Sequence, residues 1–288
     1  MNDAVFRSAG AAAVVNAEYR RVLDRWPVTS TELRVPTSQG ETFVIASGPE
    51  GASAVVLLHG SQANSAAWIP DVPLWSRSFR LFAVDMIGEA GFSARSRPEL
   101  SGEAHALWLD DVFRGLGISR AILVGTSLGG WLALDHAVRR PERVRGLALI
   151  CPAGIGRQKN FLLKALPFLA LGSYGKRRIR EMVFGPMPDV LPAELAPIAR
   201  LMDTIAASIR PRVVAIPVLS DEQLERLAVP VLAIVGGRDV LLDSRQTRDR
   251  LERFVPNAEV HFIEDGFHFL PRQSGRVMAF LERVARAE

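Results

Sequence analysis

The sequence has a single cysteine, Cys151, among its 288 residues. One cysteine cannot form an internal disulfide, which fits a reducing compartment, and we expect a cytoplasmic protein. The first ten residues, MNDAVFRSAG, lack the basic start and the long apolar segment of a signal peptide. The longest apolar stretch, residues 161–172, contains Lys164 and Pro167 and is too short to span a bilayer. We therefore expect no stable insertion into a membrane.

The excess of positive over negative charge is also small. The chain has 35 Lys and Arg against 31 Asp and Glu, a net charge of +4. Such a small excess over this length predicts no nucleic-acid partner, and the run Lys176-Arg177-Arg178 is most often a solvated helix face. No cluster of residues has metal-ligand spacing, so we expect no metal and no other cofactor. The composition, with 48% hydrophobic and 23% charged residues, is ordinary for a globular protein.

Continuous apolar runs recur along most of the chain and alternate with helical patterns. Runs that are apolar on both faces are typical of buried parallel strands, and helices between them predict an α/β fold with a mostly parallel sheet covered on both faces. The expected strands are residues 54–58, 81–84, 121–124, 147–150, 231–235 and 259–263. The expected helices are residues 102–116, 127–139, 245–254 and 274–287, and a helix over 4–25 with a hairpin of strands 32–36 and 42–47 precedes them.

Residues 153–227 interrupt this alternation because they contain no buried strand. They show helical pieces at 161–171, 176–184, 191–209 and 221–227. We interpret this segment as a helical cap inserted after the sixth strand, near the carboxyl ends of the strands, where open α/β sheets bind ligands. The predicted core domain is therefore 1–152 with 228–288, in which 1–27 is the N-terminal helix, and the predicted cap is 153–227.

The sequence GTSLGGW lies between a predicted buried strand and a predicted helix. A Gly-X-Ser-X-Gly motif in this context is a nucleophile elbow, which makes Ser127 the candidate nucleophile. The turn is so tight that flanking side chains would collide, and Gly125 and Gly129 remove those collisions. Ser127 would lie at a helix N-terminus, where the N–H of Leu128 is placed to bind a developing oxyanion.

A serine nucleophile needs a base and an acid that orients the base, in the chain order Ser, acid, His. Asp239 follows the strand 231–235 through a glycine turn, and His268 follows the strand 259–263. Asp243 is a rival acid that could instead cap the next helix. The other histidines are weaker candidates by position, since they fall in a turn, in helices or within a strand: His59, His105, His136 and His261.

A second oxyanion donor is expected from the loop after the third strand. The backbone N–H of Ser61 is our candidate, with Gly60 and Gln62 as alternatives. The loop could also be an ordinary turn with no role in oxyanion binding. Cys151, at the end of the strand that follows the elbow helix, could touch the pocket but is more often a buried structural thiol.

Taken together, the motifs LLHGSQANSAAW, AVDMIGEAGFSARS, LVGTSLGG, PERVRGLALICPAG, AIVGGRD and GFHFLP resemble the α/β-hydrolase superfamily over about residues 30–288. The N-terminal part looks most similar to a subgroup of bacterial carboxylesterases. The resemblance implies hydrolysis of a small-molecule ester through an acyl-enzyme. It also implies that Asp85 is structural and helps to hold the active-site loops.

Several alternatives stay open. A serine at the elbow argues against the epoxide-hydrolase and dehalogenase branches, and the Phe-Leu-Pro after His268 weakens the carbon–carbon hydrolase branch. The same triad could serve a thioesterase, an acyltransferase or a cyclase, and the fold could be an inert binding protein. The apolar residues of 161–169 could line an acyl pocket or pack the cap on the core, and the helix with Lys176 could lie on an anionic membrane. A homodimer is also open.

Overall fold

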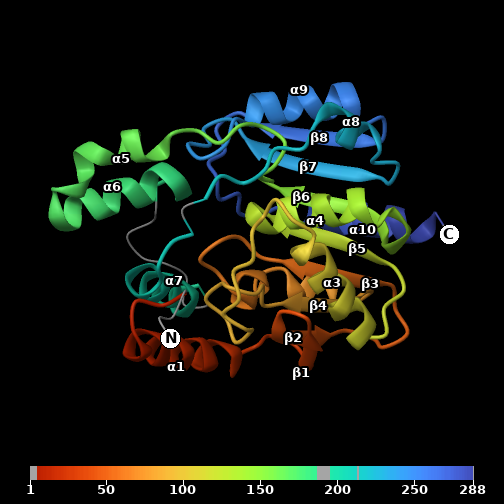
Figure 1. The fold of residues 1–288 in the computed structure, drawn as a ribbon, viewed down its shortest axis with the longest axis horizontal. Coiled ribbons are helices and arrows are strands. Elements are labelled where there is room, and N and C mark those ends of the chain that lie inside the picture. Colours follow the sequence, from red (N-terminus) through yellow and green to blue (C-terminus); the bar gives the residue numbers. More distant parts are fainter. Residues whose placement is uncertain (1–4, 187–194, 213, 288) are drawn as a thin grey trace.

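The computed structural model describes residues 5–186, 195–212 and 214–287. Its centre is a sheet of eight strands in the order β1-β2-β4-β3-β5-β6-β7-β8 (Figure 1). From β4 onward the strands pair in parallel, while β1 pairs with β2 and β2 with β4 in antiparallel fashion. The bounds are β1 Ser30–Thr37, β2 Gly40–Ser47, β3 Ala54–Leu58, β4 Arg80–Val84, β5 Ala121–Thr126, β6 Val144–Ile150, β7 Val231–Gly236 and β8 Ala258–Ile263. The predicted fold class is confirmed.

The inner parallel strands are apolar on both sides because the two sides of each strand pack into different cores. In β3, Val56 and Leu58 belong to one buried cluster, whereas Val55 and Leu57 belong to the other. Side chains alternate between the faces of a sheet, so a strand between two helical layers must be apolar at every position. This alternation explains why the sequence showed continuous apolar runs there.

Helices cover both faces of the sheet. The first core includes buried side chains from α3 (Ala104–Gly115), α4 (Leu128–Arg139), α8 (Asp221–Glu225) and α9 (Ser244–Phe254). The second core includes side chains from α1 (Ala9–Leu23), α2 (Val72–Trp75) and α10 (Ser274–Arg286). Two short 3-10 helices, η1 (Ser65–Trp68) and η2 (Pro141–Arg143), lie in the connections. The predicted helices are thus present, with ends that differ by one or a few residues.

The N-terminal helix begins later than the sequence suggested. We expected it from residue 4, which lies outside the described residues, and α1 begins at Ala9 after Ser8, whose side chain accepts a hydrogen bond from the N–H of Ala11. Such a cap satisfies a donor that the first helical turn leaves free. The preceding Phe6 forms an antiparallel bridge with Ile209 instead. The N-terminal segment therefore pairs with Ile209, the residue that follows α7 (Ala196–Ser208).

The helices between β6 and β7 lie in three places (Figure 1). α5 (Phe161–Leu169) packs with α6 (Gly172–Phe184) beyond the edge of the sheet, α7 (Ala196–Ser208) packs on α1, and α8 packs on α9. Part of the predicted piece 191–209 lies outside the described residues. The described part of the segment between β6 and β7 is thus mainly helical, and the cap as well as the division into core and cap domains stays a prediction. Among the residues that the structure describes, no helix has the length and apolarity needed to cross a membrane.

Candidate active site

Ser127 lies at a strained turn between β5 and α4. Its φ of 52° and ψ of −112° are unusual for a residue with a side chain. The two flanking glycines permit this turn, since a Cβ on Gly125 would come within 2.5 Å of the Gly129 carbonyl oxygen. A Cβ on Gly129 would lie 2.1 Å from the carbonyl oxygen of Leu58 in β3. The elbow therefore requires glycine at both positions because neighbouring backbone occupies the space.

The three predicted catalytic side chains are joined by hydrogen bonds. His268 Nε2 lies 3.1 Å from Ser127 Oγ, and His268 Nδ1 lies 2.7 Å from Asp239 Oδ2. Asp239 is almost fully buried, and its Oδ1 accepts hydrogen bonds from the N–H groups of Leu241 (2.7 Å) and Leu242 (3.0 Å). The acid is thus held in place from one side while its other oxygen faces the imidazole. Because a carboxylate only accepts, Nδ1 carries the proton and Nε2 can accept from Ser127.

The rival acid has a different place. The side chain of Asp243 accepts a hydrogen bond from the N–H of Gln246 at 3.1 Å and so caps α9. Among the other histidines, His136 is fully buried beside Phe113, and burial lowers its pKa to about 4. His261 contacts Glu259. Of the candidate acids and histidines, His268 bonds Ser127 Oγ and Asp239 bonds His268.

The loop after β3 lies beside the elbow. A Cβ on Gly60 would be 3.5 Å from the Cβ of Ser127. The N–H of Gln62 donates to Glu89 Oε2 at 2.6 Å, so this alternative oxyanion donor is already engaged. His59 holds the loop, since its Nδ1–H donates to the Gly60 carbonyl (2.8 Å) while its Nε2 accepts from the Met86 N–H (3.0 Å). Burial lowers the pKa of His59, which keeps the ring neutral for both contacts.

Asp85, which directly follows β4, joins α1, η1 and the loop after β4. Its Oδ1 accepts from the Tyr19 hydroxyl (2.9 Å) and from the N–H and hydroxyl of Ser65 (2.9 and 2.7 Å). Its Oδ2 accepts from the Phe92 N–H at 2.8 Å. Burial and the nearby carboxylate raise the pKa of Tyr19, so the hydroxyl stays a donor. These contacts fit the structural role that the resemblance implied. Tyr19 was missed as a partner because no local pattern links α1 to this loop.

Glu89 is a buried acid near the site that could not be recognised from the sequence. It is 3% exposed, and burial raises its pKa to about 7, while the nearby charges of Arg97 and Arg212 oppose that rise. Through Gln62 it contacts the loop that carries Ser61. The only available signal was an acidic residue inside an otherwise apolar loop, MIGEAGF.

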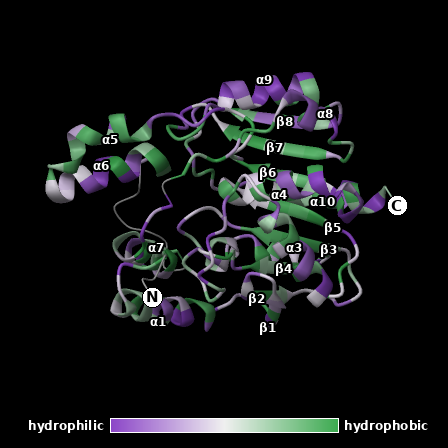
Figure 2. Cartoon of the chain, in the orientation of Figure 1, coloured by the Kyte–Doolittle hydropathy of each residue, from purple (hydrophilic) through white to green (hydrophobic). Residues whose placement is uncertain are grey.

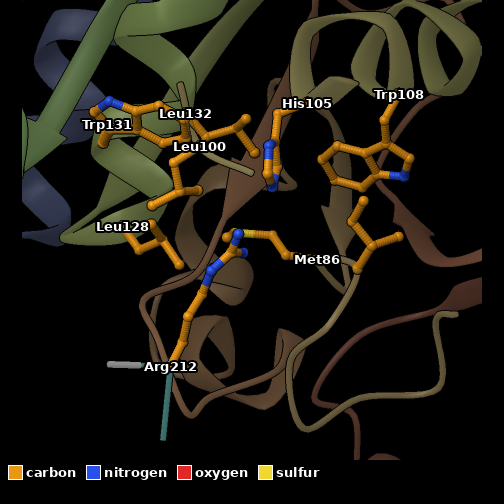
Figure 3. A pocket seen from close by; sticks show the side chains of 9 residues that line it. Met86, Leu100, His105, Trp108, Leu128, Trp131, Leu132 and Arg212 are labelled. Carbon is orange, nitrogen blue, oxygen red and sulfur yellow. The ribbon is translucent and has the colours of Figure 1, made fainter. Parts of the chain in front are cut away.

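A small cavity of about 10 Å³ lies beside Leu128 (Figure 3). Met86, Leu100 and Trp131 contribute apolar walls, and the side chains of His105 and Arg212 point into the same space. The volume is close to what one water molecule needs and far below that of a ligand pocket. An acyl group could enter only if these side chains moved.

Cys151 lies close to the site, but its thiol is expected to be unreactive. Its Sγ, a carboxylate oxygen of Asp239 and a ring nitrogen of His268 lie within 4.8 Å of one another. Burial raises the pKa of the thiol well above its ordinary value, so the protonated form persists, whereas a metal ligand must be a thiolate. Asp239 and His268 already bond each other. The structure therefore agrees with a buried structural thiol.

The strand order and the helices on both faces of the sheet are those of an α/β-hydrolase fold, and the sequence comparison agrees. Residues 55–279 match the model of the alpha/beta hydrolase family. The chain belongs to this family.

Two carboxylesterases of Bacillus subtilis are among the proteins similar to this chain. "Uncharacterized carboxylesterase nap" of Bacillus subtilis is 32% identical, over 91% of this chain and 90% of that protein. "Carboxylesterase YbfK" of the same organism is 30% identical, over 91% and 92%. The crystal structure of naproxen esterase (carboxylesterase NP) from Bacillus subtilis superposes with a TM-score of 0.81 at 30% identity, over 98% of this chain and 99% of that one. These similarities support a carboxylic ester hydrolase.

Proposed function

We propose that the chain hydrolyses carboxylic esters with Ser127 as the nucleophile, His268 as general base and then general acid, and Asp239 as the group that orients His268. The observation that carries this proposal is the hydrogen-bonded series from Ser127 Oγ through His268 to Asp239. The family membership and the carboxylesterases among the relatives support the same reaction.

The first half of the reaction forms an acyl-enzyme. Ser127 Oγ attacks the ester carbonyl while His268 Nε2 takes its proton. The negative charge that develops on the carbonyl oxygen is stabilised by the backbone N–H groups of Leu128 and Ser61. Asp239 stabilises the imidazolium, which then protonates the departing alcohol.

The second half uses the same groups in the opposite order. His268 takes a proton from water, the resulting hydroxide attacks the acyl carbon, and the proton returns to Ser127 Oγ. No further group is needed, because the acid, the base and the oxyanion donors are all supplied by the chain.

The ester is proposed to be small to medium in size and apolar. Support comes from Met86, Leu100 and Trp131, which contribute apolar walls beside Leu128, in a space that His105 and Arg212 also enter and that must widen to admit an ester. Apolar walls with few polar groups suit an acyl or alcohol chain. The apolar residues of α5 do not contribute to this space.

The test is hydrolysis of p-nitrophenyl esters from acetate to decanoate by the wild type and Ser127→Ala. Turnover that peaks at one chain length and vanishes in Ser127→Ala is the expected result, and the peak measures the acyl site. If the wild type cleaves no ester although an organophosphate still labels Ser127, ester hydrolysis is wrong. A thioester, a carbon–carbon bond or an acyl acceptor other than water is then the next substrate to assay.

A further inference from the structure

Helices α5 and α6 expose large apolar side chains to solvent. Leu162, Leu163, Leu166 and Leu169 of α5 are between 60% and 66% exposed, and Leu171 and Tyr174 add 48% and 59%. Figure 2 shows α5 as an apolar helix set apart from the sheet. The sequence left two possibilities for these residues, an acyl pocket or packing on the core, and in the structure the four leucines do neither. Contiguous exposed apolar surface of this kind marks a binding site.

The side of α5 that faces α6 is already filled. Ala165 is the buried residue of α5, and a Cβ on Gly175 of α6 would lie 1.8 Å from the carbonyl oxygen of Phe168. The two helices therefore meet backbone to backbone, and the leucines lie on the side that α6 does not cover. A partner for them must come from outside the pair.

The charge of the chain identifies the kind of partner. Residues 161–184, which we term the arm, contain Lys164, Lys176, Arg177, Arg178 and Arg180 and a single acidic residue, so they carry a net charge of +4. The remaining residues hold 30 basic and 30 acidic side chains, because the totals are 35 and 31. The whole excess of positive charge therefore lies within the arm, where Arg177 and Arg178 pair with Glu181 and Arg180 pairs with Asp203 of α7.

This distribution disfavours a second copy of the chain as the partner. Two arms placed face to face would bring +4 against +4, and like charges across an interface are repulsive. An anionic lipid surface suits both the exposed leucines and the positive charge of the arm. Its acyl chains can accommodate leucine side chains, and its phosphate groups attract lysine and arginine.

We propose that the arm docks on the surface of an anionic lipid bilayer, with the α5 leucines among the acyl chains and the basic residues at the phosphates. The arm lies on the surface and does not cross the bilayer.

The docked arm is linked to the candidate active site. The N–H of Phe269 donates to the carbonyl oxygen of Val183 at 3.4 Å, and the rings of Phe269 and Phe184 lie 5.8 Å apart. Phe269 follows His268 directly, so the end of α6 contacts the loop of the proposed base. Docking would thus bring the site toward esters dissolved in the bilayer, a conclusion that rests on the proposed ester hydrolysis.

The experiment is cosedimentation with vesicles, performed in a Ser127→Ala background so that no lipid is cleaved. Vesicles of phosphatidylcholine are compared with vesicles that also contain phosphatidylglycerol, at low and high salt. The parent should sediment with the anionic vesicles at low salt and less at high salt. The pairs Leu162→Ser/Leu166→Ser and Lys164→Gln/Lys176→Gln should each weaken binding about tenfold or more.

Matched controls lie on other helices. Val14 on α1 is 57% exposed, and the side chain of Arg286 on α10 is 76% exposed. Val14→Ser and Arg286→Gln remove the same kinds of group and should bind as the parent does. Circular dichroism of every variant checks the fold.

Three results would overturn the proposal: no sedimentation with anionic vesicles at low salt, equal binding by the leucine pair and the parent, or equal binding to neutral and anionic vesicles. A dimer in sedimentation velocity that Leu162→Ser/Leu166→Ser dissociates would likewise replace it with a self-interface. None of these results bears on the proposed ester hydrolysis, which is measured separately on soluble esters.

Discussion

At the scale of single residues, the site depends on which carboxyl group faces His268. Asp239 and Asp243 are four positions apart, yet one bonds the imidazole and the other caps α9. Chain order and the preceding strand were enough to favour Asp239 from the sequence. The backbone N–H groups of Leu241 and Leu242 that fix it were not foreseeable, because they depend on the path of the loop.

The two aspartates provide a matched pair of substitutions. Asp239→Asn keeps the shape but removes the charge and the tautomer control, and kcat for a p-nitrophenyl ester should fall about 10⁴-fold. Asp243→Asn keeps a capping side chain, so activity should change less than about twofold and the free energy of unfolding by a few tenths of a kcal/mol. Equal losses of kcat in both variants would show that Asp239 does not orient the base.

Glu89 should make stability depend on pH. Its pKa is raised from 4.5 to about 7 in the folded protein, so the folded state holds the proton more strongly than the unfolded state. The stability that this confers is complete below pH 4.5 and is lost as pH rises through 7, by roughly 3 kcal/mol.

The measurement is urea unfolding of the wild type and Glu89→Gln at pH 5 and pH 8. Glutamine can still accept the Gln62 N–H but does not ionise, so the variant should lose less stability than the wild type between these pH values. Comparing the two proteins cancels the other buried groups that titrate in both, such as His105. An identical loss in both proteins would place the pKa of Glu89 near its ordinary value.

At the scale of elements, the sequence predicted best those strands and helices whose own hydrophobic pattern shows their type and burial. The runs over β3 to β7 are apolar on both faces and were recognised as buried strands. The packing of α7 on α1 and the bridge from Phe6 to Ile209 were not predictable, since an amphipathic helix shows which side is buried but not against what. For the same reason, the hydrogen bond from Tyr19 to Asp85 could not be predicted from the sequence.

That bond can be tested with the two tyrosines of the chain. Tyr19→Phe removes a buried donor to the Asp85 carboxylate and should lower the free energy of unfolding by about 1.5–3 kcal/mol. Tyr174 on α6 is 59% exposed, and Tyr174→Phe should change stability by less than about 0.5 kcal/mol. Urea unfolding measures both. Two equal values would mean that α1 is not held through Tyr19.

The elbow itself makes a steric prediction. A side chain on Gly129 would meet the Leu58 carbonyl oxygen at 2.1 Å, whereas Gly275 of α10 has open space around it. Gly129→Ala should therefore abolish ester hydrolysis and reduce soluble yield. Gly275→Ala should be fully active and up to about 1 kcal/mol more stable, since alanine favours a helix. Normal activity in Gly129→Ala would contradict the tight approach of the elbow to β3.

At the scale of the whole molecule, the parallel sheet brings the ends of β5, β7 and β8 to one edge, and Ser127, Asp239 and His268 follow those strands. This placement could be predicted from the sequence because the edge at which a parallel strand ends is fixed by its direction. The position of the arm could not, since the sequence shows that residues 161–184 are apolar and basic but not that they are left uncovered.

The central claim is that Ser127 is a nucleophile activated by His268 and Asp239. Its most direct test is peptide mass mapping after reaction of the protein with a fluorophosphonate. The account predicts one adduct, on Ser127, that forms slowly in Asp239→Asn and is absent from Ser127→Ala. An unmodified Ser127 in the folded wild type, or an adduct on another residue, would contradict it.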